Sequence, residues 1–351
     1  MSYLPYFRPN ITAMTGYVPG EQPRAEKIIK LNTNENPFPC SPKVKAAIGR
    51  VVQAGLQKYP DPMATAFRIR AGDLYGFDPE WILCGNGSDE LLTMITRALV
   101  DSGDRIRYAN PGYILYKTLA EIQGATTDVV NFNADWSLGD AFANPVDRLK
   151  LAFLANPNSP SGTMLSPERV AKLAGELPCP LVVDEAYVDF ADANCLALVR
   201  KHENILVTRS LSKSYALAGL RFGFVVAQPQ MIEQLRKVKD SYNCDALSIA
   251  GATAAIDDQT WLQETRAAIL ATRERMMAAL RELGFASVPS QANFVWNPHP
   301  SVPVEPLYQK LKAAGVLVRY MNYALWGDGL RISVGTDEQV DACLDLLKTL
   351  V

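Results

Sequence analysis

Short apolar runs alternate with segments of helical periodicity through the middle of the chain. Residues 81–86 (WILCGN) form an apolar run typical of a buried strand, and residues 88–99 (SDELLTMITRAL) then carry apolar residues at helical spacing. Strands alternating with helices indicate βαβ units, so we expect an α/β fold with a mainly parallel sheet covered by helices on both faces. The further strands are expected over residues 104–110, 149–157, 179–190, 203–210 and 220–227, with helices over 112–124 and 166–177.

The pattern changes after Pro229. Residues 231–284 are almost continuously helical, with a break expected near Asn243, and the rest of the chain mixes strands with helices. Residues 1–40 are rich in proline and asparagine and read as an extended arm, with a helix starting after Ser41 and Pro42. The expected division is an arm over 1–40 that joins the small domain, a large domain over 41–245, and a connecting helix with a small α+β domain over 246–351.

Composition narrows the class of partner. Lysine and arginine total 35 and aspartate and glutamate total 37 among 351 residues, a formal net charge of −2. This balance argues against nucleic acid or an anionic membrane as a partner, and no apolar run reaches the roughly 18 residues of a membrane span. The start of the chain lacks the pattern of a secretory leader, so a cytoplasmic location is expected. Six scattered cysteines without a CxxC pair and only two histidines exclude a multi-histidine metal centre and disfavour a disulfide framework.

Polar residues follow two of the predicted strands, where ligands bind in open parallel sheets. In the loop over residues 85–90 (GNGSDE), Gly87 permits a tight turn and Ser88 opens the next helix, whose N-terminus attracts anions. This loop fits a phosphate cradle or simply a well-capped helix. Asp184 ends the apolar run LVVD, and Tyr187 follows three residues later. Asp184 is either a helix cap or a carboxylate able to pair with a protonated ring nitrogen.

Two cations follow in the next loops. Lys213 lies in a hydroxyl-rich turn with Ser210 and Ser212, where it is either an ordinary surface lysine or an amine able to form a Schiff base. Arg221 lies in an apolar segment and therefore requires an anionic partner. An acid for a ring nitrogen, an amine for an aldehyde and a cradle for a phosphate together describe pyridoxal 5′-phosphate.

The chain resembles the fold-type I pyridoxal-phosphate-dependent aminotransferases almost from end to end, and within them the histidinol-phosphate aminotransferase family. The resemblance implies amino transfer between L-histidinol phosphate and 2-oxoglutarate in histidine biosynthesis, giving imidazole-acetol phosphate and L-glutamate. It also implies a homodimer with a shared active site. The motifs that carry it are, in chain order, LNTNENPFPCSP, QKYPDP, GNGSDE, NPGYILY, NPNSPSG, VVDEAY, RSLSKSYALAGLRFGF, SQANFV and GLRISVGT.

The resemblance implies roles for individual residues. Lys213 would be the Schiff-base lysine and the base that moves the proton, Asp184 the partner of the ring nitrogen, and Tyr187 the donor to the phenolate oxygen O3′. The other implied cofactor contacts are ring stacking by Tyr113 and phosphate contacts from Gly87, Ser88, Asp89 through its backbone amide, Ser210, Ser212, Arg221, and Tyr59 of the neighbouring subunit.

One motif departs from the family pattern. Relatives often read NPTG with its asparagine near O3′, but the matching position here is Ser159, in NPNSPSG. Either Asn158 supplies the amide instead, or Ser159 contacts O3′ itself.

The substrate end is also implied by the resemblance. Arg331 in GLRISVG would take the anionic group of either substrate, phosphate or carboxylate. Arg319 is a second cation for phosphate or a solvated charge at a strand end. The residues expected to close over the substrate are Asn34, Glu35, Asn36 and Tyr17, the last of which could equally be a packing aromatic.

Other readings of the sequence stay open. An aromatic-amino-acid aminotransferase or a decarboxylase of an amino-acid phosphate would share these cofactor residues. A non-catalytic regulator that binds pyridoxal phosphate would be expected to carry a DNA-binding module, and none is recognisable. A Rossmann-type nucleotide binder is disfavoured because the loop over residues 85–90 lacks the third glycine of GxGxxG.

Overall fold

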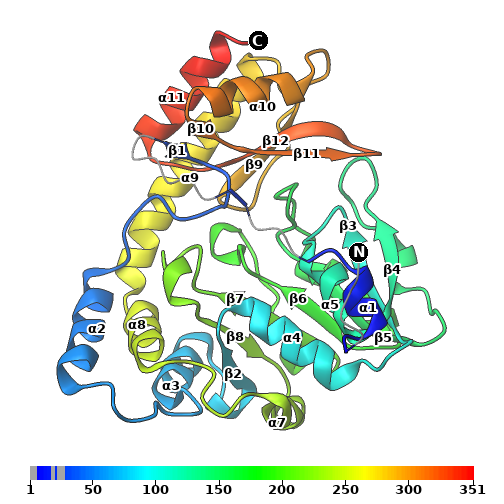
Figure 1. Cartoon of the computed structure of the whole chain (residues 1–351), viewed down its shortest axis with the longest axis vertical. Coiled ribbons are helices and arrows are strands. Elements are labelled where there is room, and N and C mark those ends of the chain that lie inside the picture. The colour runs from blue at the N-terminus through cyan, green and yellow to red at the C-terminus, as the bar shows by residue number, and fades with distance from the viewer. Residues whose placement is uncertain (1–5, 17–19, 22–27) are drawn as a thin grey trace.

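The computed structural model describes residues 6–16, 20–21 and 28–351. Its centre is a seven-stranded sheet with the strand order β2-β8-β7-β6-β5-β3-β4 (Figure 1). Strands β3 to β7 pair in parallel, whereas β8 is antiparallel to both β7 and β2, so the predicted mainly parallel α/β fold is confirmed. The strands of this sheet are β2 (Ile82–Gly85), β3 (Arg105–Asn110), β4 (Thr126–Asn131), β5 (Leu149–Ala155), β6 (Leu181–Asp184), β7 (Ile205–Ser210) and β8 (Gly223–Val226).

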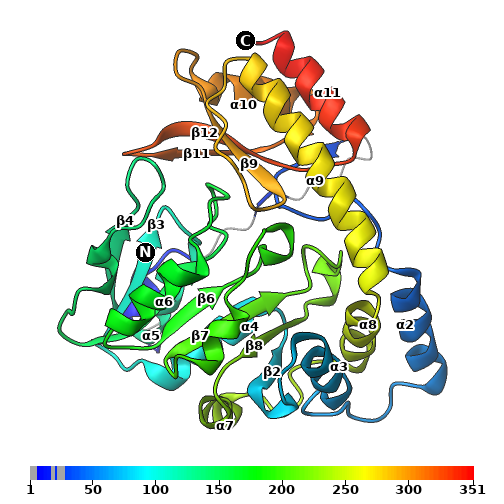
Figure 2. The same cartoon turned by 180° about the vertical axis from the view of Figure 1, so that it is seen from behind.

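Both faces of the sheet are buried, because successive residues of its strands enter two separate cores. On β6, Leu181 and Val183 join one core while Val182 joins the other. Helices α4 (Ser88–Leu99), α5 (Leu115–Gln123) and α7 (Pro229–Val238) contribute to the core that contains Val182. The opposite core receives α3 (Thr65–Tyr75), α6 (Pro167–Glu176) and α8 (Ala246–Ile256), and α6 is seen on that side in Figure 2.

A second region is built mainly from the carboxyl-terminal part of the chain. Its antiparallel sheet has the order β11-β12-β9 and packs with a third core that contains Ile269 and Leu280 of the long helix α9. The two-residue strand β1 pairs in parallel with β10, so the arm adds its backbone to this region. Its elements are β1 (Ile29–Lys30), α9 (Gln259–Glu282), β9 (Phe294–Pro298), α10 (Val304–Ala313), β10 (Val316–Leu317), β11 (Arg319–Tyr323), β12 (Gly327–Ser333) and α11 (Asp337–Lys348).

Several expected elements are present and others differ. Helix α2 (Pro42–Ala54) starts after Ser41, whose side chain accepts from the Lys43 backbone N–H as an N-cap. The helical stretch after Pro229 breaks near Asn243, as expected, but a second break at residues 257–258 separates α8 from α9. Residues 316–323 are divided between two strands, because β10 pairs with β1 and β11 pairs with β12. The sequence reading assigned no strand where β4 lies.

Shorter elements complete the described chain. Helix α1 (Pro9–Ala13) lies against α5, where the Asn10 side chain donates to the Glu121 carbonyl at 2.6 Å. Among the described residues, no helix combines the length and the apolarity that crossing a membrane requires. The domain boundaries near residues 40 and 245 remain our proposal. The single-turn 3₁₀ helices are Pro79–Trp81, Asp140–Ala143, Val188–Phe190, Leu196–Arg200 and Ala218–Leu220.

Candidate active site

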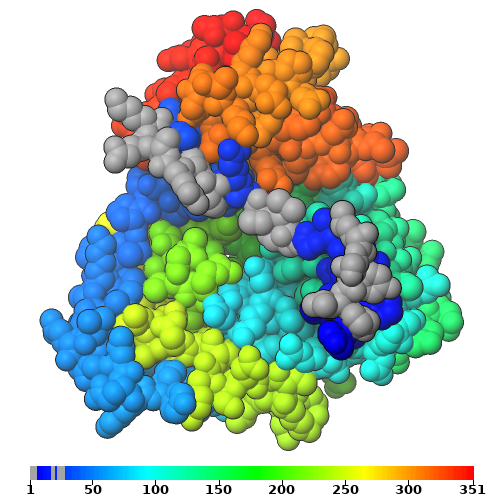
Figure 3. Space-filling model, viewed as in Figure 1, coloured from blue at the N-terminus to red at the C-terminus, as the bar shows by residue number. Residues whose placement is uncertain are grey.

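A cavity of about 740 Å³ lies between the carboxyl ends of the parallel strands and the second region. The space-filling view shows a recess there, with the green segments of the large sheet at its base and the orange C-terminal region above (Figure 3). Ligands of open α/β sheets bind at this edge, so the cavity is the place where the fold favours a site. Its lining includes the sequence-predicted residues Asn34, Glu35, Ser88, Asp89, Tyr113, Ser159, Asp184, Tyr187, Ser210, Ser212, Lys213, Arg221, Arg319 and Arg331.

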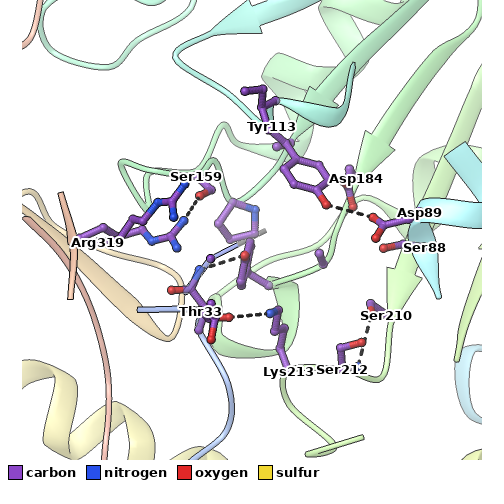
Figure 4. A pocket seen from close by; sticks show the side chains of 18 of the residues that line it. Thr33, Ser88, Asp89, Tyr113, Ser159, Asp184, Ser210, Ser212, Lys213 and Arg319 are labelled. Carbon is purple, nitrogen blue, oxygen red and sulfur yellow. Dashed lines mark hydrogen bonds between the residues drawn. The ribbon is translucent and has the colours of Figure 1, made fainter. Parts of the chain in front are cut away.

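Lys213 follows β7 in the turn that the sequence predicted, and its side chain points into the cavity (Figure 4). Its Nζ donates to the Thr33 carbonyl at 3.0 Å. Burial, together with the nearby positive charge of Arg331, lowers the pKa of Lys213 to about 8. An amine with such a pKa is neutral in about a tenth of the molecules at pH 7, far more than an ordinary lysine, which suits a nucleophile or a base.

Asp184 ends β6 and is 4% exposed. Burial raises its pKa to about 6, while a hydrogen bond from the Tyr116 hydroxyl to Oδ2, at 2.9 Å, works in the opposite direction. A second and longer bond runs from Thr208 Oγ1 to Oδ1, at 3.3 Å. The carboxylate is therefore held rigidly by two hydroxyl donors at the cavity wall.

Tyr116 is a site residue that the sequence reading did not identify. It lies on α5, is 1% exposed and stacks on Phe153 with ring centroids 4.7 Å apart. In the sequence it looks like a core aromatic at helical spacing, and only its polar tip, which reaches Asp184, distinguishes it. The one available signal was that a buried tyrosine hydroxyl needs a partner.

Tyr187 lies near Lys213 on the same side of the cavity. Its hydroxyl accepts from Asn34 Nδ2 at 3.0 Å, and its ring meets Phe294 edge-on at 5.0 Å. Lys213 Nζ is 5.9 Å from the centre of the ring. Burial raises the pKa of Tyr187, so the phenol stays protonated and able to donate.

The start of α4 forms one wall of an anion cradle. Gly87 precedes the helix with φ of +81°, and a Cβ there would lie 2.7 Å from Arg221 Nη2, so the close approach of the guanidinium requires glycine. Ser88 and Asp89 form the first turn, where backbone N–H groups lack intrahelical partners. Asp89 also accepts from the Tyr113 hydroxyl at 3.1 Å, which fixes Tyr113 over the cavity (Figure 4).

The opposite wall of the cradle comes from the turn after β7. Ser210 Oγ accepts from the Ser212 backbone N–H at 3.2 Å, and Ser212 Oγ accepts from Arg221 Nη1 at 3.2 Å. Arg221 Nη2 also lies 3.5 Å from Asp89 Oδ2. Hydroxyls, a guanidinium and a helix N-terminus around one space are the donor set that a phosphate prefers. These residues, with Lys213 and Asp184, fit pyridoxal 5′-phosphate.

The second region contributes two arginines to the same cavity. Arg319 on β11 and Arg331 on β12 are directly paired across the antiparallel strands. Arg331 Nη1 donates to Ser159 Oγ at 2.9 Å, and Nη2 donates to the Asn32 carbonyl at 3.0 Å. Two guanidinium groups on neighbouring strands are donors suited to an anionic group.

The remaining sequence-predicted residues lie outside the cavity lining. Asn158 is buried and donates to the Pro111 carbonyl and to Ser161, so Ser159 is the one of the two alternatives that faces the cavity. Asn36 donates to the carbonyls of Lys213 and Ser214, both at 3.0 Å, and so holds the lysine turn from behind.

Tyr59 does not line the cavity of its own chain. Tyr59 is 79% exposed and stacks on Tyr242 at 4.4 Å, away from the cavity of its own chain. Tyr17 lies outside the described residues.

Comparisons with known proteins agree with this site. Residues 26–347 match the family model "Aminotransferase class I and II". The chain is 54% identical to a histidinol-phosphate aminotransferase of Rhodopirellula baltica over 97% of this chain and 95% of that protein. It is 46% identical to that of Geotalea uraniireducens, over 98% and 99% respectively. The crystal structure of histidinol-phosphate aminotransferase from Sinorhizobium meliloti in complex with pyridoxal-5′-phosphate covers the whole of both chains, with a TM-score of 0.90 and 27% identity.

Proposed function

Because this chain belongs to the class I and II aminotransferases, we propose that it is a pyridoxal-phosphate-dependent enzyme that exchanges an amino group between L-histidinol phosphate and 2-oxoglutarate. The products are imidazole-acetol phosphate and L-glutamate. The observation that carries the proposal is the convergence of Lys213, Asp184 and the phosphate cradle in one cavity with Arg319 and Arg331. Relatives at 46–54% identity over nearly the whole chain support the choice of substrate.

Pyridoxal phosphate, when bound, supplies an electron sink for the pair left at the substrate Cα. Asp184 holds a negative charge at the ring nitrogen and keeps its proton in place. Ser88, Ser210, Ser212 and Arg221 hold the phosphate. Tyr187 would donate to the phenolate oxygen, with Ser159, the one of the two alternatives that faces the cavity, as a second candidate contact.

Lys213 moves the proton. Its lowered pKa of about 8 lets Nζ take a proton from the substrate Cα and return it without a large energetic mismatch. Asn36 holds the backbone of the turn that carries the lysine. The side chain of Lys213 can therefore move while its backbone stays in place. Amino transfer in both directions then needs only this one base.

Arg331 and Arg319 select the substrates. One guanidinium matches the planar carboxylate of glutamate or the tetrahedral phosphate of histidinol phosphate, and the second adds charge for the doubly ionised phosphate. Glu35, at the cavity edge, is paired with Lys30. Asn34 and Glu35, which line the cavity, would lie over the bound substrate, and Tyr17 stays a predicted substrate contact outside the described residues.

We assign the working enzyme to a homodimer in the cytoplasm. Apolar side chains remain exposed on α2, α3 and the adjoining loops, among them Leu56, Ile69 and Tyr242, next to the 79% exposed Tyr59. Tyr59 then reaches the phosphate of the neighbouring subunit. All six cysteines are free thiols, which suits a reducing compartment.

Mixed dimers test the shared site. Y59A and K213A are each expected to be poorly active alone. If Tyr59 serves its neighbour, a mixed dimer of the two carries one site with both defects and one intact site, so mixing restores activity. Failure of mixing to restore activity, with mixed dimers demonstrated by mass, would assign Tyr59 a role within its own chain.

The substrate is tested by paired-donor kinetics. The purified enzyme is given 2-oxoglutarate and either histidinol phosphate or phenylalanine, and kcat/KM is measured for each. We expect the phosphate-bearing donor to be preferred, and R319A to lower kcat/KM for histidinol phosphate more than for phenylalanine. A larger kcat/KM for phenylalanine would replace this substrate by an aromatic amino acid while leaving the cofactor assignment intact.

A further inference from the structure

Asn34 has a backbone conformation that few residues adopt. Its φ is +57°, in the left-handed region, and the residue is 1% exposed. Asparagine tolerates this region better than most residues, but the conformation persists only where surrounding contacts hold it, and such positions cluster at functional sites. The contacts around Asn34 must therefore hold this conformation in place.

The second region holds Asn34 from three directions. Its backbone N–H donates to Ser333 Oγ at 2.9 Å, and its carbonyl accepts from Asn293 Nδ2 at 2.9 Å. The Ser333 hydroxyl in turn donates to Asn34 Oδ1 at 2.9 Å. Ser333 lies on β12 two residues after Arg331, so the strand that presents the substrate arginine also anchors Asn34.

These contacts determine which way the Asn34 amide faces. Ser333 Oγ accepts from the backbone N–H and has a single proton, which points at Asn34 Oδ1. The amide nitrogen consequently faces the large sheet, where it donates to the Tyr187 hydroxyl at 3.0 Å. Since that hydroxyl oxygen is an acceptor on the Asn34 side, its own proton is directed elsewhere.

We propose that Asn34 is a positioning residue that aims the Tyr187 proton into the cavity, toward the phenolate oxygen of the cofactor. The inference rests on the proposed function. It matters in this chain because Ser159, which stands where relatives often carry asparagine, has its hydroxyl oxygen engaged by Arg331 at 2.9 Å. Position 159 therefore offers no asparagine amide beside Tyr187, although the Ser159 hydroxyl keeps a proton of its own, and the direction of the Tyr187 proton is set by a residue of the arm.

The charges around Tyr187 define what a titration would report. Arg331 favours the ionised phenol, whereas Asp184 and Asp89 oppose it, and Lys213 faces the ring. The Asn34 side chain bonds Tyr187 and Ser333, neither of which is one of these four groups. A shift on changing Asn34 is therefore attributable to the lost amide donor and, in N34D, to the added carboxylate.

The experiment uses two variants of the holoenzyme, N34D and N34G. In N34D the side chain keeps its size, but its carboxylate accepts the Tyr187 proton and turns it away from the cavity. Loss of a donor to a phenolate oxygen raises the pH midpoint at which the visible absorbance band of the bound cofactor changes. We expect an upward shift of about one pH unit in N34D, or about tenfold in proton affinity, and a smaller upward shift in N34G.

A matched control separates the direction of the Tyr187 proton from a general loss of stability. N293S removes the hydrogen bond to the Asn34 carbonyl while leaving the amide on Tyr187, so we expect a lower melting temperature with the parent midpoint. Glycine adopts a positive φ without strain, so N34G tests the inference even if N34D does not fold. Parent-like midpoints in N34G and in any folded N34D, or an equal shift in N293S, would overturn it. A parent protein that binds no pyridoxal phosphate would instead overturn the proposed function.

Discussion

The two ends of the cavity are built differently. At the cofactor end, Asp184, Lys213 and Arg221 come from consecutive segments of one parallel sheet and its turns, and Asp184 is fixed by buried hydroxyl donors. At the substrate end, Arg319 and Arg331 come from a separate antiparallel sheet, and the facing residues come from the arm. The chemistry is thus held by one continuous scaffold, whereas substrate recognition depends on how two regions meet.

The largest effect is expected at the cofactor end. K213A removes both the attachment point and the base, so kcat should fall by about 10⁴-fold or more. The visible band of the lysine-bound cofactor should disappear, although the protein still folds. Retained turnover with a parent-like band would show that another amine does this work.

At the substrate end, loss of one arginine should affect binding more than the chemistry of the lysine. R331A leaves Ser159 and the Asn32 carbonyl without their partner, and we expect kcat/KM to fall about 100- to 1,000-fold. R319A, matched on the neighbouring strand, should cost about tenfold. In R319A the absorbance of the bound cofactor should stay as in the parent; an altered band would mean that the two ends are not separable.

The buried acid makes the cofactor-free protein sensitive to pH. Because the pKa of Asp184 is raised from 3.8 to about 6, folding favours its protonated form, and this contribution to stability is lost as pH rises through about 6. D184N cannot ionise. Its free energy of unfolding relative to the parent should therefore rise by about 2 kcal/mol between pH 4 and pH 7.

Chemical denaturation of both cofactor-free proteins at the two pH values measures this difference. Added pyridoxal phosphate should reverse the order of stability of the parent and D184N at pH 7. Only the parent offers a carboxylate to the ring nitrogen. A constant difference at both pH values would show that Asp184 does not titrate in this range.

The smallest effect is expected from the donor behind Asp184. Tyr116 lowers the pKa of the acid, so Y116F should raise it. The pH at which the cofactor-free protein loses affinity for pyridoxal phosphate should move upward by less than about one unit. T208V, which removes the longer bond to the same carboxylate, should move it less. Equal shifts would mean that bond length does not rank the two donors.

Much of the cofactor end is predictable from the sequence, for a physical reason. Parallel strands bring their carboxyl ends to one edge, so polar residues after successive apolar runs must converge. Asp184 and Lys213 follow this rule, whereas Arg221 reaches the same edge because it precedes β8, which runs antiparallel to β7. The fold itself follows from the strand and helix periods. Strand β4 was missed because its sequence, TTDVVN, alternates weakly at the edge of the sheet.

Contacts between residues far apart in the sequence are less predictable, because no local period encodes them. The bond from Tyr116 to Asp184 joins residues 68 positions apart, and the bond from Asn34 to Ser333 joins residues 299 apart. Asn36 was expected at the substrate, but its amide holds the backbone of the lysine turn. A family resemblance names such residues without saying which atom each one touches.

The pairing of β1 with β10 has a consequence for synthesis of the protein. Ile29 and Lys30, made near the beginning of translation, find their partners only when Val316 and Leu317 have left the ribosome. All seven strands of the large sheet have been translated by residue 226. A nascent chain therefore has the strands that bind a vitamin B6 derivative well before it has the strands that bind the substrate.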